Sequence, residues 1–170
     1  TFVTRKITRG LSRINEGLEN VLYLGNLDAK RDWGHAKEYC ELMWLILQQE
    51  KPDDYVVATG RQVSVRSFIE MTAKELNWNK NGSSNGIIWE GEGLNEIGRR
   101  ADNGEIVIKI DSIYYRPSEV DNLIGNPEKI KKSLGWEPLI SLEELVKEMV
   151  NSDLNEIKKE KLLASKQLDN

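Results

Sequence analysis

Residues 21–33 read VLYLGNLDAKRDW, a short apolar run followed by a polar loop. The run from Val21 to Leu24 has the composition of a buried strand, and Gly25-Asn26 ends it. We therefore expect a short strand that delivers a loop carrying Arg31.

Helices are predicted on both sides of this strand. Apolar residues between positions 3 and 18 recur at helical spacing, and Arg5, Arg9 and Arg13 line another face of the same helix. Such a basic face is more often solvated than bound to RNA or a membrane. Residues 35–50 form a second, strongly apolar helix, which we expect to be a central element of the core.

Further elements are predicted downstream by periodicity, caps and turn residues. They are strands at Tyr55–Ala58, Ile87–Trp89 and 106–110, a helix from Ser64 to about Asn77, a short helix over 127–134, and a long helix opened by the capping box Ser141–Glu144. The polar, turn-rich stretch at 79–86 makes the region 79–112 the least compact part of the prediction. Alternating helices and short strands indicate an α/β (α+β-like) fold, a small sheet with packed helices.

Composition excludes several classes of protein. The net charge of −4 argues against a general nucleic-acid binder, and no apolar run approaches the length of a membrane span. The single cysteine, Cys40, and the single histidine, His35, predict neither an internal disulfide nor a metal site. These observations favour a cytoplasmic protein in a reducing compartment.

No complete catalytic or cofactor motif is found. The nearest match to G-x-G-x-x-G is Gly91 and Gly93 followed by Glu96, and Arg99-Arg100 stands where a P-loop needs Lys-Ser/Thr. No tyrosine is followed by a lysine four residues on, and no carboxylate pair is marked out as an acid/base couple. We therefore assign no catalytic, cofactor-binding or metal-binding residue to this chain.

Two arginines are candidates for binding a diphosphate. Arg31 follows the strand-end loop, and Arg116 precedes Pro117, which favours an extended backbone that can direct the guanidinium into a cleft. Glu119 could accept hydrogen bonds from ribose hydroxyls or a base edge. The alternatives are a surface pair of Arg31 with Asp32 or Asp28, and a loop salt bridge of Arg116.

An ordered series of segments closely resembles the C-terminal half of the GDP-mannose 4,6-dehydratase family, within the extended short-chain dehydrogenases. They are FVTRKITRG (2–10), LYLGNLD (22–28), KRDWGHAKEY (30–39), YRPSEV (115–120) and LGWEP (134–138). The resemblance covers nearly the whole chain, so residues 1–170 are interpreted as a nucleotide-sugar-binding portion.

The resemblance implies a lyase that converts GDP-mannose to GDP-4-keto-6-deoxymannose, the precursor of GDP-fucose. In that family an N-terminal Rossmann half binds NADP and supplies the catalytic residues, so this chain alone is expected to be inactive. The full-length protein is expected to be a homo-oligomer.

The resemblance also implies roles for six residues. Val3 and Lys6 lie near the nucleotide, Asn26 in the strand-end loop, Arg31 and Arg116 at the diphosphate, and Glu119 at the ribose or base. Residues 96–103 match the family less clearly and are interpreted as a lid. The alternatives are a non-catalytic nucleotide-sugar binding module, and a related epimerase or dehydratase acting on another nucleotide sugar.

Overall fold

The computed structural model describes residues 2–79, 85–120 and 122–168, so much of the predicted turn-rich stretch at 79–86 lies outside the described residues. The elements follow in the order α1 (Val3–Asn15), β1 (Leu22–Leu24), β2 (Lys30–Arg31), α2 (Ala36–Leu47), β3 (Val63–Ser64), α3 (Val65–Glu75), β4 (Ile87–Glu90), the 3₁₀ turn η1 (Gly93–Asn95), β5 (Ile97–Arg100), β6 (Ile106–Ile110), α4 (Glu128–Leu134) and α5 (Leu142–Leu168). The α/β class with a small sheet and packed helices is confirmed.

The main sheet has four strands in the order β1-β6-β5-β4. β1 runs parallel to β6, whereas β6, β5 and β4 are antiparallel neighbours. Three of these strands come from the region predicted to be least compact. A second, two-stranded sheet pairs β2 with β3.

The interpretation of residues 96–103 as a lid is wrong, because Ile97–Arg100 is an interior strand of the main sheet. Two of its four residues are arginines, so the strand lacks the apolar pattern from which strands are predicted. In the structure Arg99 donates to Glu90 at 3.0 Å, and the Arg100 guanidinium lies 4.3 Å from the centre of the Trp78 ring. These contacts provide partners for charged side chains of a kind that is uncommon in an interior strand.

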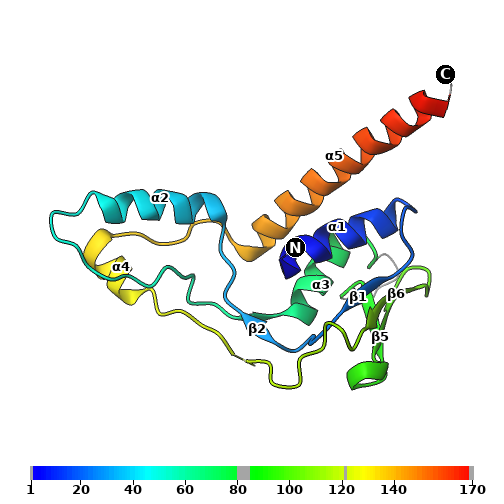
Figure 1. The fold of residues 1–170 in the computed structure, drawn as a ribbon, viewed down its shortest axis with the longest axis horizontal. Helices are drawn as coiled ribbons and strands as arrows, with labels where there is room; N and C mark the ends of the chain where they lie inside the picture. Colours follow the sequence, from blue (N-terminus) through cyan, green and yellow to red (C-terminus); the bar gives the residue numbers. More distant parts are fainter. Residues whose placement is uncertain (1, 80–84, 121, 169–170) are drawn as a thin grey trace.

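Three helices, α1, α3 and α5, pack together beside the sheet and enclose the core (Figure 1). The predicted apolar stripe of α1 supplies buried Ile7 and Leu11, which meet buried Phe68 of α3 in one hydrophobic cluster. Burial of such side chains provides most of the driving force for folding. The main sheet with α1, α3 and α5 is called the body below.

Part of the basic face of α1 is covered by α5, so the face predicted to be solvated is solvated only in part. Arg5 pairs with Asp153 and, at 2.9 Å, with Glu156, while Arg13 pairs with Glu160 at 2.8 Å. Arg9 alone of the three arginines remains exposed. The α5 carboxylates complement the charge of two of these arginines.

Local capping signals agree with the structure. The Ser64 hydroxyl accepts the Ser67 N–H at 3.1 Å, at the start of α3. Ser141 and Glu144 exchange the reciprocal bonds of a capping box, and Gly135 ends α4 with φ of +65°.

Two predictions fail on the other side of the molecule. α2 forms at its expected place, but it projects away from the main sheet with α4 (Figure 1) instead of lying in the core. Met43, Trp44 and Leu47 are 51%, 61% and 80% exposed. Residues 55–58, predicted as a strand, belong to no sheet. We call residues 36–60 together with 122–140 the side lobe.

Among the described residues, no helix is both long and apolar enough to cross a bilayer.

Candidate ligand-binding site

A cavity of about 1100 Å³ lies between α1, the loop after β1, β2 and the segment from Tyr114 to Glu119. Its volume is at the upper end of the range for small-molecule sites. All six residues predicted to bind substrate line it, namely Val3, Lys6, Asn26, Arg31, Arg116 and Glu119. The structure therefore brings together residues that are up to 116 positions apart in the sequence, while their contact with a ligand stays a prediction.

Arg31 is fixed by three acceptors. Its guanidinium donates to Glu119 Oε1 at 2.5 Å, to the Val120 carbonyl at 2.8 Å and to the Lys30 carbonyl at 2.7 Å. Both charged side chains of the Arg31–Glu119 pair are mostly buried. This geometry holds the segment after Arg116 against β2 and presents a preoriented guanidinium at the cavity wall.

The alternative pairing of Arg31 with Asp32 or Asp28 is wrong, because both carboxylates are used elsewhere. Asp32 accepts from the main-chain N–H groups of Thr59 and Gly60, each at 2.9 Å. Asp28 accepts from Arg66 at 2.9 Å. The partner that the structure does provide, Glu119, is 88 positions away and was predicted only as a ligand acceptor.

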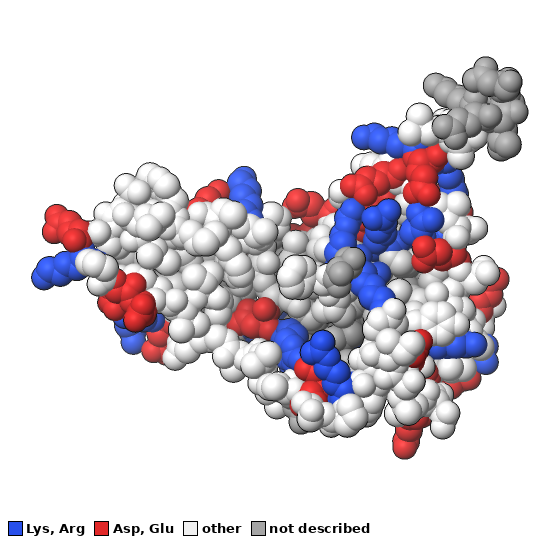
Figure 2. Space-filling view, viewed as in Figure 1, with Lys and Arg blue, Asp and Glu red and all other residues white. Residues whose placement is uncertain are grey.

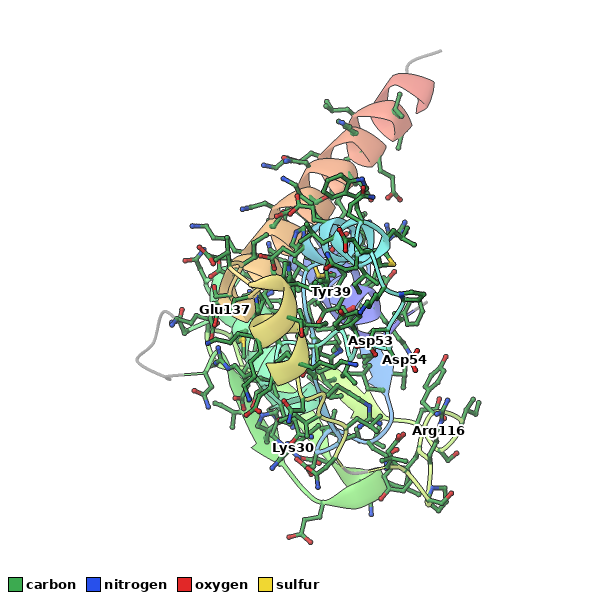
Figure 3. All side chains as sticks on the ribbon, turned by 90° about the vertical axis from the view of Figure 1, so that its left-hand side faces the viewer. Lys30, Tyr39, Asp53, Asp54, Arg116 and Glu137 are labelled. Atoms are coloured by element: carbon green, nitrogen blue, oxygen red, sulfur yellow. The ribbon has the colours of Figure 1, made fainter. Side chains whose placement is uncertain are left out.

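Asn26 positions Arg116 through the main chain. Its Nδ2 donates to the Arg116 carbonyl at 3.0 Å, and its Oδ1 accepts the Arg116 N–H at 2.8 Å. Gly25 makes this approach possible, because a Cβ there would collide with the Tyr114 carbonyl. The ion pairs of the described residues do not include the Arg116 guanidinium, and Figure 3 shows Arg116 on a loop well apart from α4.

Lys6 faces the same cavity from α1. Its ammonium lies 3.4 Å from the centre of the Tyr114 ring, a cation–π contact that holds the Tyr114 segment against the helix. Partial burial lowers the pKa of Lys6, and the Asp111 carboxylate opposes that shift. A partly dehydrated ammonium is a stronger partner for an anion than a fully hydrated one.

Other basic residues line the cavity although they were not predicted to do so. Arg5, Arg9 and Arg13 line it together with Lys6, and Figure 2 shows basic side chains gathered over α1 beside the carboxylates of α5. Among the described residues Arg9 forms no ion pair within 4 Å, although its charge acts on Asp153. The spacing of four between these arginines was the available signal, but it did not reveal that a cavity lies beside them.

The described residues contain no group of three or more His, Cys, Asp or Glu side chains arranged to hold a metal ion. The guanidinium and ammonium groups of the cavity wall suit a ligand with several negative charges.

Comparison with protein families gives a match to the model of GDP-mannose 4,6 dehydratase over residues 1–149. A relative described as GDP-mannose 4,6 dehydratase 2 from Caenorhabditis elegans is 53% identical over 154 residues, which are 91% of this chain and 38% of the relative. The GDP-mannose 4,6 dehydratase of Homo sapiens is 47% identical over 153 residues, 90% of this chain and 39% of the relative. The chain thus spans less than half the length of these curated relatives.

Solved structures show the same fold. The structure of RMD from Pseudomonas aeruginosa complexed with NADPH has a TM-score of 0.69 at 19% identity, covering 91% of this chain and 43% of that one. The dTDP-glucose 4,6-dehydratase from Bacillus anthracis in complex with NAD has a TM-score of 0.60 at 18% identity, covering 85% of this chain and 37% of that one. At these identities the similarity concerns the fold alone.

Proposed function

This chain belongs to the GDP-mannose 4,6-dehydratase family, and on that premise we propose that residues 1–170 form the nucleotide-sugar-binding portion of such an enzyme. The ligand is GDP-mannose, held in the cavity beside α1. The observation that carries the proposal is the convergence of Arg31 and Arg116 on one cavity.

Each cavity residue has a distinct role in the proposal. Arg116, whose guanidinium is unpaired among the described residues, binds the diphosphate, and the oriented Arg31 supplies a second guanidinium beside it. Asn26 is a positioning residue, because the oxygen and the nitrogen of its side-chain amide both form hydrogen bonds with the main chain of Arg116. Arg116 and the remaining N–H donors of Arg31 can bind the diphosphate and so hold the attached hexose in one orientation.

The nucleotide lies along α1 in this proposal. Val3 and Lys6 contact it. Glu119 accepts a hydrogen bond from a ribose hydroxyl or a base edge through Oε2, the carboxylate oxygen that is not bound to Arg31. Binding energy from these remote groups contributes to catalysis when it orients the reacting sugar.

Cofactor binding and chemistry are assigned to polypeptide beyond this chain. Among the described residues no strand is followed by a glycine-rich loop that opens a helix, which is the dinucleotide-binding arrangement. We propose that NADP and the catalytic groups belong to the remaining length seen in the relatives, that the whole enzyme is a homo-oligomeric lyase, and that this chain alone is inactive.

A fusion experiment tests the proposal. The chain is placed behind the N-terminal part of the Caenorhabditis elegans relative that lies outside the matched stretch, and products of GDP-mannose, UDP-glucose and dTDP-glucose are followed with NADP present. Of the three nucleotide sugars, we expect the fusion to dehydrate only GDP-mannose. We expect the isolated chain to convert none of them. A folded fusion that binds GDP-mannose without converting it would favour a non-catalytic binding module, and conversion of a UDP- or dTDP-sugar instead would favour the related enzymes.

A further inference from the structure

Arg66 joins α3 to two other parts of the chain, although it does not line the ligand cavity. Its guanidinium donates to Glu96 at 2.5 and 3.2 Å and to Asp28 at 2.9 and 3.1 Å. Glu96 directly precedes β5, and Asp28 lies in the loop between β1 and β2. Paired hydrogen bonds fix the orientation of a carboxylate as well as its distance. Arg66 therefore ties this loop to the main sheet.

The Arg66 guanidinium is itself ordered by contacts within the body. It lies 4.7 Å from the centre of the Trp89 ring, and Glu70 of α3 accepts the indole N–H of Trp89 at 2.9 Å. The Glu96 side chain is mostly buried. An exposed ion pair usually contributes little, because it must order two flexible side chains. Here the arginine is already ordered, so its bond to Asp28 can hold the loop.

The main chain of the loop is bound to the start of α3 as well. The Arg66 N–H donates to the Leu27 carbonyl at 2.8 Å, and the Val65 N–H donates to the Ala29 carbonyl at 3.1 Å. Leu27 and Ala29 are buried, whereas the Asp28 side chain between them is 80% exposed. Arg66 thus binds adjacent residues of the loop with its main chain and its side chain.

The loop held in this way supports the groups assigned to the diphosphate. Asn26, two residues before Asp28, forms hydrogen bonds with both main-chain polar groups of Arg116. Arg31, three residues after Asp28, donates to Glu119. Asn26, Arg31, Arg116 and Glu119 all line the cavity. A displacement of the loop would therefore move these groups together.

A second arginine of the body provides a comparison. Arg100 donates to Asp102 at 2.9 and 2.7 Å, and its guanidinium lies over the Trp78 ring. These three residues do not line the cavity. Arg66 has the same kinds of partner, but one of its carboxylates belongs to the loop that supports the cavity residues. This partner is what gives the Arg66 network a link to the site.

We propose that Arg66 is a positioning residue of the ligand-binding site. Its guanidinium clamps Asp28 to Glu96 and fixes residues 25–29, from which Asn26 holds Arg116 in the orientation that binds the diphosphate. This inference rests on the proposed function, which assigns the diphosphate to Arg116. Preorganised groups bind a ligand more tightly, because less conformational freedom is lost on association.

Asp28→Ala tests the clamp, because the exposed side chain can be removed without opening the core. We expect the variant to bind GDP-mannose about threefold more weakly than the wild-type chain in calorimetric titration, because the loop is less ordered. Removal of a negative charge would by itself favour binding of an anion. The two effects have opposite signs, so weaker binding reports positioning and not charge. Tighter binding would overturn the inference.

Glu90→Ala is the matched control. Glu90 accepts from Arg99 with both carboxylate oxygens at 3.0 Å, is exposed, and lies outside the cavity. The substitution therefore removes the same charge and the same kind of ion pair as Asp28→Ala. We expect an affinity for GDP-mannose at least equal to that of the wild-type chain. An equal loss of affinity in both variants would overturn the inference.

The Arg116 amide reports on the clamp without any ligand, because its N–H donates to Asn26. We expect this amide to exchange at least about threefold faster in Asp28→Ala than in the wild-type chain, and at the wild-type rate in Glu90→Ala. Hydrogen exchange followed by NMR resolves it. An unchanged rate in Asp28→Ala would overturn the inference.

The two measurements separate this inference from the proposed function. If the folded wild-type chain does not bind GDP-mannose, the proposed function fails, while faster exchange of the Arg116 amide in Asp28→Ala still supports the clamp. If the wild-type chain binds, faster exchange combined with an unchanged affinity would overturn the positioning role.

Arg66→Lys tests the arginine itself. Lysine keeps the charge but cannot form paired hydrogen bonds with two carboxylates. We expect the folded variant to bind GDP-mannose at least about threefold more weakly than the wild-type chain. Wild-type affinity of this variant would overturn the inference, and if the variant does not fold, Asp28→Ala decides.

Discussion

The body and the side lobe both contain helices with apolar faces but use them differently. In the body, the apolar stripe of α1 meets α3 and α5, and ion pairs such as Arg13–Glu160 join the helices around it. In the side lobe, α2 is at least as apolar, yet Trp44 and Leu47 face solvent. The comparison teaches that a hydrophobic pattern predicts which residues are suited to burial, whereas contacts between distant segments decide whether they are buried.

The largest expected difference between the two regions is in the response to truncation. Phe68→Ala in the body should lower the free energy of unfolding by ~4 kcal/mol, because it leaves a cavity around a fully buried ring. Leu47→Ala in the side lobe should change it by less than ~0.5 kcal/mol, because that side chain is 80% exposed. Urea unfolding of both variants of the isolated chain measures this, and equal losses would remove the distinction.

Local opening should follow the same division. In the isolated chain we expect amides of α2 to exchange at least about tenfold faster than those of α3, because α2 has little buried apolar surface to hold it. Native-state hydrogen exchange followed by mass spectrometry resolves both helices. Equal protection would mean that the side lobe unfolds only together with the body.

Within the body, one helix serves the core and the cavity with different faces. Arg9→Ala should weaken binding of GDP-mannose by about fivefold (~1 kcal/mol), since Arg9 is an exposed cation of the cavity wall without an ion pair among the described residues. Arg99→Ala, which removes an arginine paired with Glu90 outside the cavity, is the matched control. Calorimetric titration should give unchanged affinity for the control, and an unchanged affinity for Arg9→Ala would exclude a role in binding.

The smallest predicted effect concerns the ion pairs of the body. The hydrogen bond from Lys161, at 2.8 Å, holds the pKa of Glu16 below its usual value. The Glu16 carboxylate therefore binds a proton more readily in the unfolded chain than in the folded one. The ion pair with Lys161 stabilises the fold above the usual glutamate pKa, and this stabilisation is lost as the pH falls through the lowered pKa of the folded state. Glu16→Gln should cost ~0.5 kcal/mol at pH 7 and less than that at pH 3, after allowance for solvent screening.

Urea unfolding at the two pH values checks this prediction. A cost that is the same at both would show that packing, and not charge, is responsible.

Local rules were sufficient where an element is determined by its own residues. Ser64 begins a helix, Ser141 and Glu144 form a capping box, and Gly135 ends a helix with positive φ. These features depend on contacts over three or four positions. They could be predicted because no distant residue alters them.

Features that depend on distant partners could not be predicted in this way. The strand Ile97–Arg100 acquires its neighbours from β4 and β6, and residues 55–58 stay outside any sheet although their composition is suited to one. Arg31 finds Glu119 across 88 positions, while the nearer carboxylates of Asp28 and Asp32 are used by other groups. Arg31, Arg116 and Glu119 were candidates from the sequence itself, whereas Val3, Lys6 and Asn26 were predicted through family resemblance. Spacing alone does not show which of these residues converge in space.

Calorimetric titration of GDP-mannose into the isolated chain and its Arg116→Ala variant tests the central claim most directly. The wild-type chain should bind, and the variant should bind about 30-fold more weakly (~2 kcal/mol) because a charge-assisted contact to the diphosphate is lost. Its free energy of unfolding should stay unchanged, since the Arg116 guanidinium has no ion pair among the described residues. Equal affinity of the two proteins, or no binding by the folded wild-type chain, would contradict the account.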